Sequence, residues 1–233
     1  MKPSVSLVMP FYNEIGYMRM TIAKAQYVLN AMETDYEIVL INDASCDGSE
    51  TIAVMLAAED PRIRVFHHDR NKGLGAALKT GFHNVKKDVI IYTDVDMPFD
   101  FSILKDAIPL LEKSDVVHGY RIGKRENLLR TIYSRTYNFL ITMIFGYKTS
   151  DINFAMTIFK REVLDKISMR ANGSFISAEF LLKSSYNGFK VINIPVTFNQ
   201  RKYGRSHLAS LRNISRTIYE IIKYYPEIRS LYC

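Results

Sequence analysis

The feature that most constrains the fold is a regular alternation of short apolar runs with longer helical patterns in the first half of the chain. Strands that alternate with helices of ten or more residues predict a βαβ series and a mostly parallel sheet. The runs are apolar throughout, as expected for strands covered by helices on both faces. We expect strands at Val5–Met9, Glu37–Ile41, Ile63–His67, Val89–Thr93 and Val116–Gly119, and helices at about 16–31, 49–58, 74–85 and 102–113.

The second half has longer apolar segments and a less regular pattern. We expect helices at Leu128–Phe145, Ala178–Tyr186 and Leu208–Tyr225, strands at Phe154–Phe159 and Lys190–Phe198, and a basic loop at Arg201–Ser206. No change of composition separates the halves. We therefore expect one α/β domain over residues 1–208, divided at about residue 120, and a C-terminal amphipathic helix in 209–233.

Charge and apolar length narrow the choice of partners and compartment. The net charge of +7 favours polyanionic partners, but no basic run or basic stripe interleaved with aromatics indicates nucleic acid. The apolar run Val5–Met9 is too short for a signal peptide, and no window reaches the ~18 apolar residues of a spanning helix. We expect a cytoplasmic protein, or one on the cytosolic face of a membrane. Cys46 and Cys233 form no disulfide or metal-binding pattern.

Polar residues follow three of the expected strands. The first strand is followed by residues 10–14 (Pro-Phe-Tyr-Asn-Glu), the second by 42–45 (Asn-Asp-Ala-Ser), and the fourth by Asp94-Val95-Asp96. In open α/β sheets, ligands bind beyond the carboxyl ends of the strands. These segments are therefore expected to converge on one edge of the sheet, where a nucleotide would bind.

Asp94 and Asp96 are the sharpest single feature of the sequence. Two carboxylates one residue apart, directly after an apolar strand, suit a hard divalent cation such as Mg²⁺ or Mn²⁺. A bound cation of this kind stabilises a departing diphosphate. The alternative is a pair of solvated loop carboxylates, because Asp-x-Asp by itself is a common pattern.

Four motifs occur in order along the chain: Pro-x-Tyr-Asn-Glu, Asn-Asp-x-Ser-x-Asp-Gly, Asn-x-Gly-x-Gly-x-Ala and Asp-x-Asp. In this order the chain resembles the family-two glycosyltransferases of the GT-A fold, and within them the polyprenol-phosphate sugar transferases such as dolichol-phosphate mannose synthases. The resemblance runs from Val5 to about Ser206. Beyond the four motifs it rests on Gly119–Arg121, Arg130, Ser134, Asn138, Asp151–Arg161, Glu179 and Arg201–Ser206.

The resemblance implies an inverting transfer of a sugar from a UDP- or GDP-sugar to a dolichyl or undecaprenyl phosphate, with peripheral membrane contact. Residues 1–120 would form the nucleotide-binding half and 121–208 the acceptor half. The donor would be held by Pro10, Tyr12, Glu14, Asp43, Asp94 and Arg201, the metal by Asp94 and Asp96, and the acceptor phosphate by Arg130 and Ser134. The catalytic residues would be Asp96, Arg121 and Glu179.

The chain departs from that family pattern at two positions. Asn42 stands where the family usually has a first aspartate, although the base-binding carboxylate is normally the second, here Asp43. Pro98 stands where mannose synthases have a glutamine that serves as a further metal ligand. Proline offers no ligand atom in its side chain, so a metal would rely on the two aspartates, water and the donor.

Two helices of the second half allow more than one interpretation. Arg130, Ser134 and Asn138 share one face of their helix and indicate an anionic partner, although Arg130 could instead pair with Glu126. The apolar stretch 139–147 suits either the core or a lipid surface. The C-terminal helix, with isoleucines opposite arginines and lysines, predicts either membrane-surface binding or docking on the domain.

The glycines of residues 71–76 indicate a helix start that packs closely, rather than a phosphate loop. Two other functions remain open. The first is transfer to a glycan hydroxyl in cell-envelope polysaccharide synthesis, for which Glu179 or Asp151 would act as the general base. The second is a non-catalytic nucleotide- or polyanion-binding protein on the same scaffold, which Asn42 and Pro98 would favour.

Overall fold

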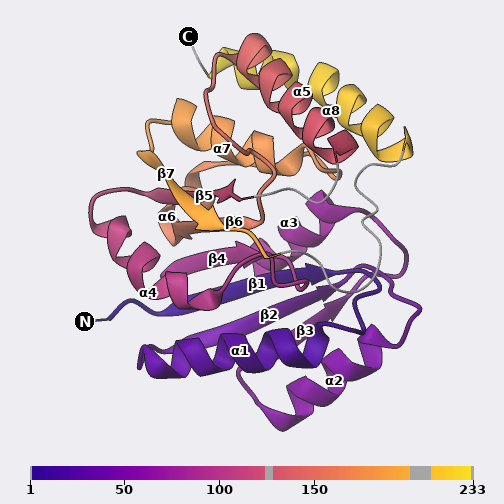
Figure 1. Ribbon diagram of the computed structural model, residues 1–233, viewed down its shortest axis with the longest axis vertical. Helices are drawn as coiled ribbons and strands as arrows, with labels where there is room; N and C mark the ends of the chain where they lie inside the picture. Colours follow the sequence, from indigo (N-terminus) through magenta and orange to yellow (C-terminus); the bar gives the residue numbers. More distant parts are fainter. Residues whose placement is uncertain (1, 124–127, 200–210, 232–233) are drawn as a thin grey trace.

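The computed structural model describes residues 2–123, 128–199 and 211–231 and shows a seven-stranded sheet with helices on both faces (Figure 1). The strand order is β3-β2-β1-β4-β6-β5-β7. All neighbouring pairs are parallel except those of β6, which runs antiparallel to β4 and β5. The strands are β1 (Val5–Phe11), β2 (Tyr36–Asn42), β3 (Ile63–His67), β4 (Val89–Thr93), β5 (Val116–Ile122), β6 (Met156–Lys160) and β7 (Val191–Thr197). The predicted mostly parallel α/β sheet is confirmed.

The helices differ from expectation at two places. A short helix, α6, follows β6 directly, and the helix expected at 102–113 is three short pieces, η1, α4 and η2. Pro109 lies at the start of η2 and lacks the N–H that a continuous helix needs there. The helices are α1 (Met18–Ala31), α2 (Ser49–Glu59), α3 (Leu74–Asn84), η1 (Phe101–Ile103), α4 (Leu104–Ala107), η2 (Ile108–Glu112), α5 (Leu128–Phe145), α6 (Arg161–Lys166), α7 (Ile176–Tyr186) and α8 (Leu211–Ser230).

Two apolar clusters cover the two faces of the sheet. Alternate residues of each central strand enter different clusters, because successive side chains of a strand point to opposite faces. In β1, for example, Leu7 belongs to the cluster that contains residues of α1, α2 and α4, whereas Val8 belongs to the cluster that contains residues of α3, α5, α7 and α8. Both side chains are fully buried. The strands are apolar at nearly every position because both faces of the sheet are covered by helices.

The helices α5 and α8 lie side by side, at the end of the molecule away from α1 and α2 (Figure 1). Each has a buried and an exposed apolar face. In α5, Ile141 and Phe145 are buried, whereas Phe139 and Met143 are 63% and 66% exposed. One face of α8, which includes Ile221 and Ile228, is docked on the domain as the docking interpretation predicted. The other face, which includes Ile218 and Ile222, is exposed. Among the described helices, none combines the length and the apolar character needed to cross a bilayer.

The start of α3 packs against the backbone that precedes α7. The Gly75 amide donates to the carbonyl of Asn172 over 2.9 Å, and the Ala76 amide is 3.4 Å from the same oxygen. A Cβ atom on Gly75 would lie 2.6 Å from the Ala171 carbonyl oxygen. The predicted close-packing role of these glycines is confirmed, and the first amides of α3 are already engaged.

We predict that Gly75→Ala lowers the free energy of unfolding by about 1–3 kcal/mol, because the added methyl group must push two backbone segments apart. Urea denaturation followed by circular dichroism measures this change. Ala76→Ser adds one atom at the neighbouring, half-buried position and should change stability by less than about 0.5 kcal/mol. Equal effects of the two substitutions would contradict the close-packing role.

Candidate functional site

A cavity of about 220 Å³ lies beyond the carboxyl ends of β1, β2 and β4. The parallel pairing of β1 with both neighbours brings these three ends to one edge of the sheet. The strand ends contribute six residues that the sequence indicated: Pro10, Tyr12, Glu14, Asp43, Asp94 and Asp96. The opposite wall comes from residues before and within α3, before α7 and on α8, including Asn71, Gly73, Leu74, Gly173, Asn213 and Arg216.

The loop after β1, which carries Tyr12 and Glu14, is tied to the loop after β2. Side chains from the second loop accept the backbone amides of the first, and one bond runs the other way. The bonds are Asn13 N to Ser45 Oγ (3.0 Å), Glu14 N to Ser49 Oγ (2.8 Å), Ile15 N to Asp47 Oδ2 (3.0 Å) and Cys46 N to Asn13 Oδ1 (2.8 Å). The Asn-Asp-x-Ser-x-Asp-Gly motif therefore shapes the cavity through its neighbour.

Each of the three strand ends contains a residue in the left-handed backbone region. Asn13, Ala44 and Met97 have φ values of 58°, 63° and 53°. Such conformations cost on the order of 1 kcal/mol for residues other than glycine and cluster at functional sites. The turn at Ala44 is closed by Asn42, whose Oδ1 accepts the Ser45 amide at 2.8 Å. The asparagine that departs from the family pattern therefore has a local structural role.

Asp43 is buried, lines the cavity and holds the loop between β3 and α3. Its carboxylate accepts the amides of Lys72 (2.9 Å) and Gly73 (2.8 Å) and is 2.7 Å from Nδ1 of His68. These contacts give Asp43 a positioning role. Its expected contact with the nucleoside stays a prediction.

The Asp94-Val95-Asp96 segment is fixed by its middle residue. Val95 is 1% exposed, and its carbonyl accepts the hydroxyl of Thr21 on α1 at 2.6 Å. The two aspartates, one on each side, are half-buried and both line the cavity. The hydroxyl of the buried Tyr92 lies 3.2 Å from Asp94 Oδ1.

The protonation of Tyr92 is set by the same environment. Burial raises the pKa of this phenol well above its ordinary value, and the charges of Asp94 and Asp96 raise it further. The phenol therefore stays protonated and acts as a hydrogen-bond donor to Asp94. This donor helps to orient one carboxylate of the pair.

The chemistry of the two carboxylates fits a divalent cation that a ligand helps to hold. Both are hard oxygen donors on one cavity, as Mg²⁺ and Mn²⁺ prefer. Among the residues that the structure describes, no group of three or more His, Cys, Asp or Glu side chains could hold a metal. Mg²⁺ typically uses one or two carboxylates and completes its shell with phosphate oxygens and water. The fit is therefore to an ion that enters with a phosphorylated ligand.

Arg121 is placed against a carboxylate rather than among the lining residues of this cavity. Its Nε and Nη2 lie 2.5 and 3.2 Å from the two carboxylate oxygens of Asp151, a residue 1% exposed. Its guanidinium also lies over the rings of Phe154 and Phe198, 5.5 and 5.1 Å from their centroids. Its expected catalytic role stays a prediction.

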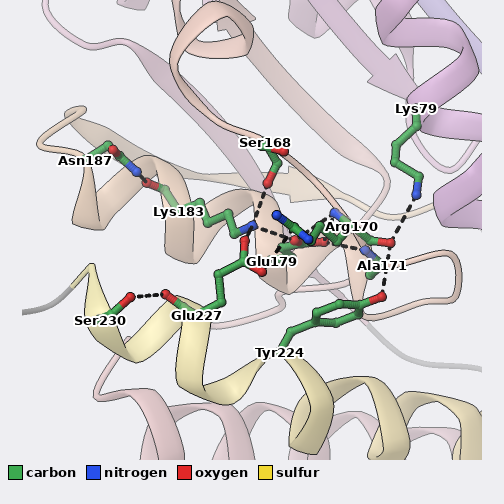
Figure 2. A network of polar contacts seen from close by, with 10 residues as sticks. All are labelled: Lys79, Ser168, Arg170, Ala171, Glu179, Lys183, Asn187, Tyr224, Glu227 and Ser230. Atoms are coloured by element: carbon green, nitrogen blue, oxygen red, sulfur yellow. Dashed lines mark hydrogen bonds and ion pairs between the residues drawn. The ribbon is translucent and has the colours of Figure 1, made fainter.

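Glu179 was expected among the catalytic residues, and the structure places its fully buried side chain in a network of polar contacts (Figure 2). Its carboxylate accepts the amides of Arg170 (2.9 Å) and Ala171 (2.8 Å) and pairs with Lys183 at 2.8 Å. It does not line the cavity. The buried charge of Glu179 thus fixes the backbone that packs on α3. Its expected catalytic role stays a prediction.

The residues expected to bind phosphate groups are only partly described. Arg201, expected at the donor, and the side chain of Arg130, expected at the acceptor phosphate, lie outside the part of the chain that the structure describes. Ser134 is half-buried on α5 and is not among the lining residues of the cavity. Asn138, on the same face of α5, binds the backbone of Ser150 (3.1 Å) and Ile152 (3.2 Å). That face therefore contacts the segment that contains the partner of Arg121.

The sequence analysis missed one wall of the cavity. Asn213 and Arg216, both on α8, line it. The pattern of α8 indicated only a basic amphipathic helix. The available signal was the i, i+4 pair of Arg216 and Glu220, which lie 3.5 Å apart at the closest atoms.

Comparison with known proteins gives a family and several relatives. The family described as "Glycosyl transferase family 2" matches residues 6–168. The polyprenol monophosphomannose synthase of Mycolicibacterium smegmatis is 27% identical over 233 residues, covering 94% of this chain and 85% of the relative. The dolichol-phosphate mannosyltransferase of Pyrococcus furiosus is 28% identical over 235 residues, covering 96% and 65%. Glycosyltransferase AglD of Haloferax volcanii is 28% identical over 208 residues, covering 84% of this chain but only 33% of the relative.

Solved structures show the same fold at lower identity. Glucosyl-3-phosphoglycerate synthase from Mycobacterium tuberculosis, in complex with Mn²⁺, UDP and phosphoglyceric acid, has a TM-score of 0.74 at 14% identity, with coverage of 97% of this chain and 78% of the other. Mannosyltransferase PcManGT from Pyrobaculum calidifontis, in complex with GDP-Man and Mn²⁺, has a TM-score of 0.66 at 18% identity, with coverage of 100% and 70%. The expected GT-A fold is confirmed.

The tie between the two loops predicts a pH-dependent stability. Burial alone would raise the pKa of Asp47, but hydrogen bonds from the Ser49 hydroxyl and from backbone amides outweigh it and lower the pKa below 3.8. A lowered folded-state pKa stabilises the protein above the unfolded pKa, and this contribution is lost as the pH falls. Asp47→Ala should therefore cost about 1–2 kcal/mol at neutral pH and progressively less toward about pH 3.

Urea denaturation at both pH values measures this difference. The control is Asp165→Ala, which removes an exposed carboxylate on α6 and should change stability by less than about 0.5 kcal/mol. A cost for Asp47→Ala that is the same at both pH values would contradict the account.

Proposed function

The chain belongs to glycosyl transferase family 2, and from this premise we propose that it transfers a sugar from a nucleoside diphosphate sugar to a polyprenyl phosphate, with inversion at the anomeric carbon. The observation that carries the proposal is the cavity where Tyr12, Glu14, Asp43, Asp94 and Asp96 meet. A structural neighbour with this fold is described with Mn²⁺ and UDP, and another with Mn²⁺ and GDP-Man. The relatives described above include transferases named for polyprenol and dolichol phosphate acceptors.

In the proposed reaction, an acceptor oxygen forms a bond to the anomeric carbon from the face opposite the nucleotide. The bond from that carbon to the diphosphate oxygen breaks, and the nucleoside diphosphate leaves with the electron pair. Asp94 and Asp96 would hold Mg²⁺ or Mn²⁺, which when bound offsets the negative charge that develops on the leaving diphosphate. Tyr92 orients Asp94 by its hydrogen bond, and Val95 keeps the two aspartates at the end of β4.

The state of the buried carboxylates supports a phosphate acceptor over a glycan hydroxyl. A hydroxyl acceptor needs a general base, and the sequence offered Glu179 and Asp151 for that role. Both are at most 1% exposed, and each is ion-paired, with Lys183 and Arg121 respectively. A phosphate monoester is already an anion at neutral pH and needs no base. Catalysis would then consist of positioning and charge stabilisation.

We also propose that α5 and α8 rest on a membrane surface, where a polyprenyl phosphate is found. The supporting observation is a set of exposed apolar side chains on the two helices, named here the α5/α8 face: Ile132, Phe139, Met143, Ile218, Tyr219 and Ile222. Lys223 lies over the rings of Tyr219 and Tyr224, 5.6 and 5.3 Å from their centroids. Apolar side chains bordered by a cation suit the boundary between acyl chains and anionic headgroups.

Asp96→Ala is predicted to abolish sugar transfer while the fold stays intact. Loss of a metal ligand should lower kcat/KM at least ~100-fold, since a bound cation stabilises the transition state by several kcal/mol. The assay measures incorporation of radiolabelled sugar from UDP- and GDP-sugars with Mn²⁺ into butanol-extractable lipid. Asp106→Ala, at an exposed position on α4, should retain full activity.

Three outcomes would count against the proposal. Full activity of Asp96→Ala would remove the metal assignment. Incorporation by the wild type into a polysaccharide fraction, with none into lipid, would favour the glycan acceptor. Binding of nucleotide without transfer or donor hydrolysis would favour the non-catalytic alternative.

Replacing Phe139 and Ile222 by glutamate should weaken binding to vesicles that contain phosphatidylglycerol at least ~10-fold, because each burial stabilises the bound state by about 1.5–3 kcal/mol. Vesicle sedimentation measures the bound fraction. Tyr27→Glu is the matched control, since Tyr27 is 76% exposed on α1, away from the α5/α8 face (Figure 1). Unchanged binding of the double variant would contradict the proposed orientation.

A further inference from the structure

We infer that Arg216, on the C-terminal helix α8, binds a phosphate group of the substrates inside the cavity. The inference rests on the proposed function and assigns a residue to it that the sequence motifs did not indicate. Arg216 lines the same cavity as Asp94 and Asp96. It therefore borders the same space in which the diphosphate of a donor would meet those two carboxylates.

Charge is the first argument. The described lining of the cavity contains four carboxylates, Glu14, Asp43, Asp94 and Asp96, and only one cationic side chain, Arg216. A diphosphate brings further negative charge into this setting. A divalent cation between the two aspartates offsets part of the repulsion, and a guanidinium on the opposite wall offsets more. Arginine also offers a planar fork of N–H donors that matches phosphate oxygens.

The space around the guanidinium is the second argument. A Cβ atom on Gly73 would lie 2.7 Å from Arg216 Nη1, and a Cβ atom on Gly173 would lie 3.2 Å from Arg216 Nε. Both glycines line the cavity with Arg216. A side chain at Gly73 would overlap both the Asn172 carbonyl oxygen and the guanidinium, and one at Gly173 would press on Glu220 Oε2 and crowd the arginine. The two glycines therefore leave the room in which the guanidinium lies.

The third argument is that the position of Arg216 is fixed before any ligand binds. Arg216 Nη2 donates to the Lys72 carbonyl at 3.0 Å, and its Nε lies 3.5 Å from Glu220. Glu220 is buried, and its Oε1 accepts the amides of Asn172 (2.9 Å) and Gly173 (2.8 Å). Glu220, one turn after Arg216 on α8, therefore contacts both the arginine and the backbone at residues 172–173.

The rest of α8 is anchored by an ion-pair network around the buried side chain of Lys183 (Figure 2). Lys183 on α7 is 3% exposed and lies 2.7 Å from Glu227 on α8 and 2.8 Å from Glu179. The Tyr224 hydroxyl donates to the Arg170 carbonyl at 3.3 Å. A guanidinium carried by a helix anchored in this way loses little side-chain freedom when it binds an anion, which favours a binding role.

The test compares ligands that differ in phosphate content. Wild type, Arg216→Ala and Arg216→Lys are titrated with UDP, GDP and the corresponding nucleosides in the presence of Mn²⁺. For the preferred base, Arg216→Ala should weaken diphosphate binding at least ~10-fold and leave nucleoside binding within about twofold, because a hydrogen bond to a charged group is lost. Arg216→Lys keeps the positive charge but lacks the planar set of N–H donors, so its diphosphate affinity should lie between those of the wild type and Arg216→Ala. Arg19→Ala, on α1, is the charge-matched control and should bind as the wild type does.

A second arm identifies which phosphate is bound. Initial rates are measured against a short-chain polyprenyl monophosphate and against the donor. A raised KM for the acceptor alone, with unchanged diphosphate binding, would assign Arg216 to the acceptor phosphate and still support the inference. Circular dichroism and thermal unfolding establish that the variants fold.

Two results would overturn the inference while the proposed function stands. One is an Arg216→Ala variant that matches the wild type in both arms. The other is an equal loss of nucleoside and diphosphate affinity, which would indicate that Arg216 only supports the loop at Lys72. Failure of the proposed function looks different, because the wild type itself would then bind no nucleoside diphosphate and transfer no sugar.

Discussion

The parallel hydrogen bonding of β1 between β2 and β4 is the constraint on which the rest of the site depends. The register pairs Phe11 with Asn42 and Val8 with Tyr92, so three strands deliver their polar ends to one edge of the sheet. Each end then turns through a left-handed residue, and side-chain hydrogen bonds join the turns after β1 and β2. The cavity is therefore a consequence of strand order, fixed by local hydrogen bonds.

The second half of the chain forms the opposite wall of the cavity, and buried carboxylates hold the backbone of that wall in place. Glu179 and Glu220 each bind two consecutive backbone amides in the segment 170–173, and that segment packs on the glycines that open α3. A buried carboxylate is costly unless it is paired and hydrogen-bonded. Glu179 pairs with Lys183, and Oε1 of Glu220 accepts two amides and lies 3.5 Å from Arg216. One end of the segment is tied to α7 and the other to α8, so the wall that carries Arg216 is part of the folded core.

Most of the framework could be predicted from the sequence, because β-branched runs and helical periods are local signals. The bounds of β3, β4 and α5 match the expected ones, and six expected site residues lie on one cavity. The features that the sequence did not predict depend on contacts between segments distant in the chain. The role of Glu179 depends on amides eight and nine residues before it and on Lys183, and the place of Arg216 depends on a helix packing across the chain. The six residues of α6 are too few to show a helical period, and one proline broke the helix expected at 102–113.

The central claim is that Asp94 and Asp96 capture a divalent ion together with the diphosphate of a donor. The most direct measurement is the anomalous diffraction of crystals grown with Mn²⁺ and UDP or GDP. The account predicts an anomalous peak within coordination distance of an Asp94 or Asp96 carboxylate oxygen and of a phosphate oxygen, inside the cavity. A nucleotide bound elsewhere, or an ion held by other residues with these two carboxylates turned away from it, would contradict the account.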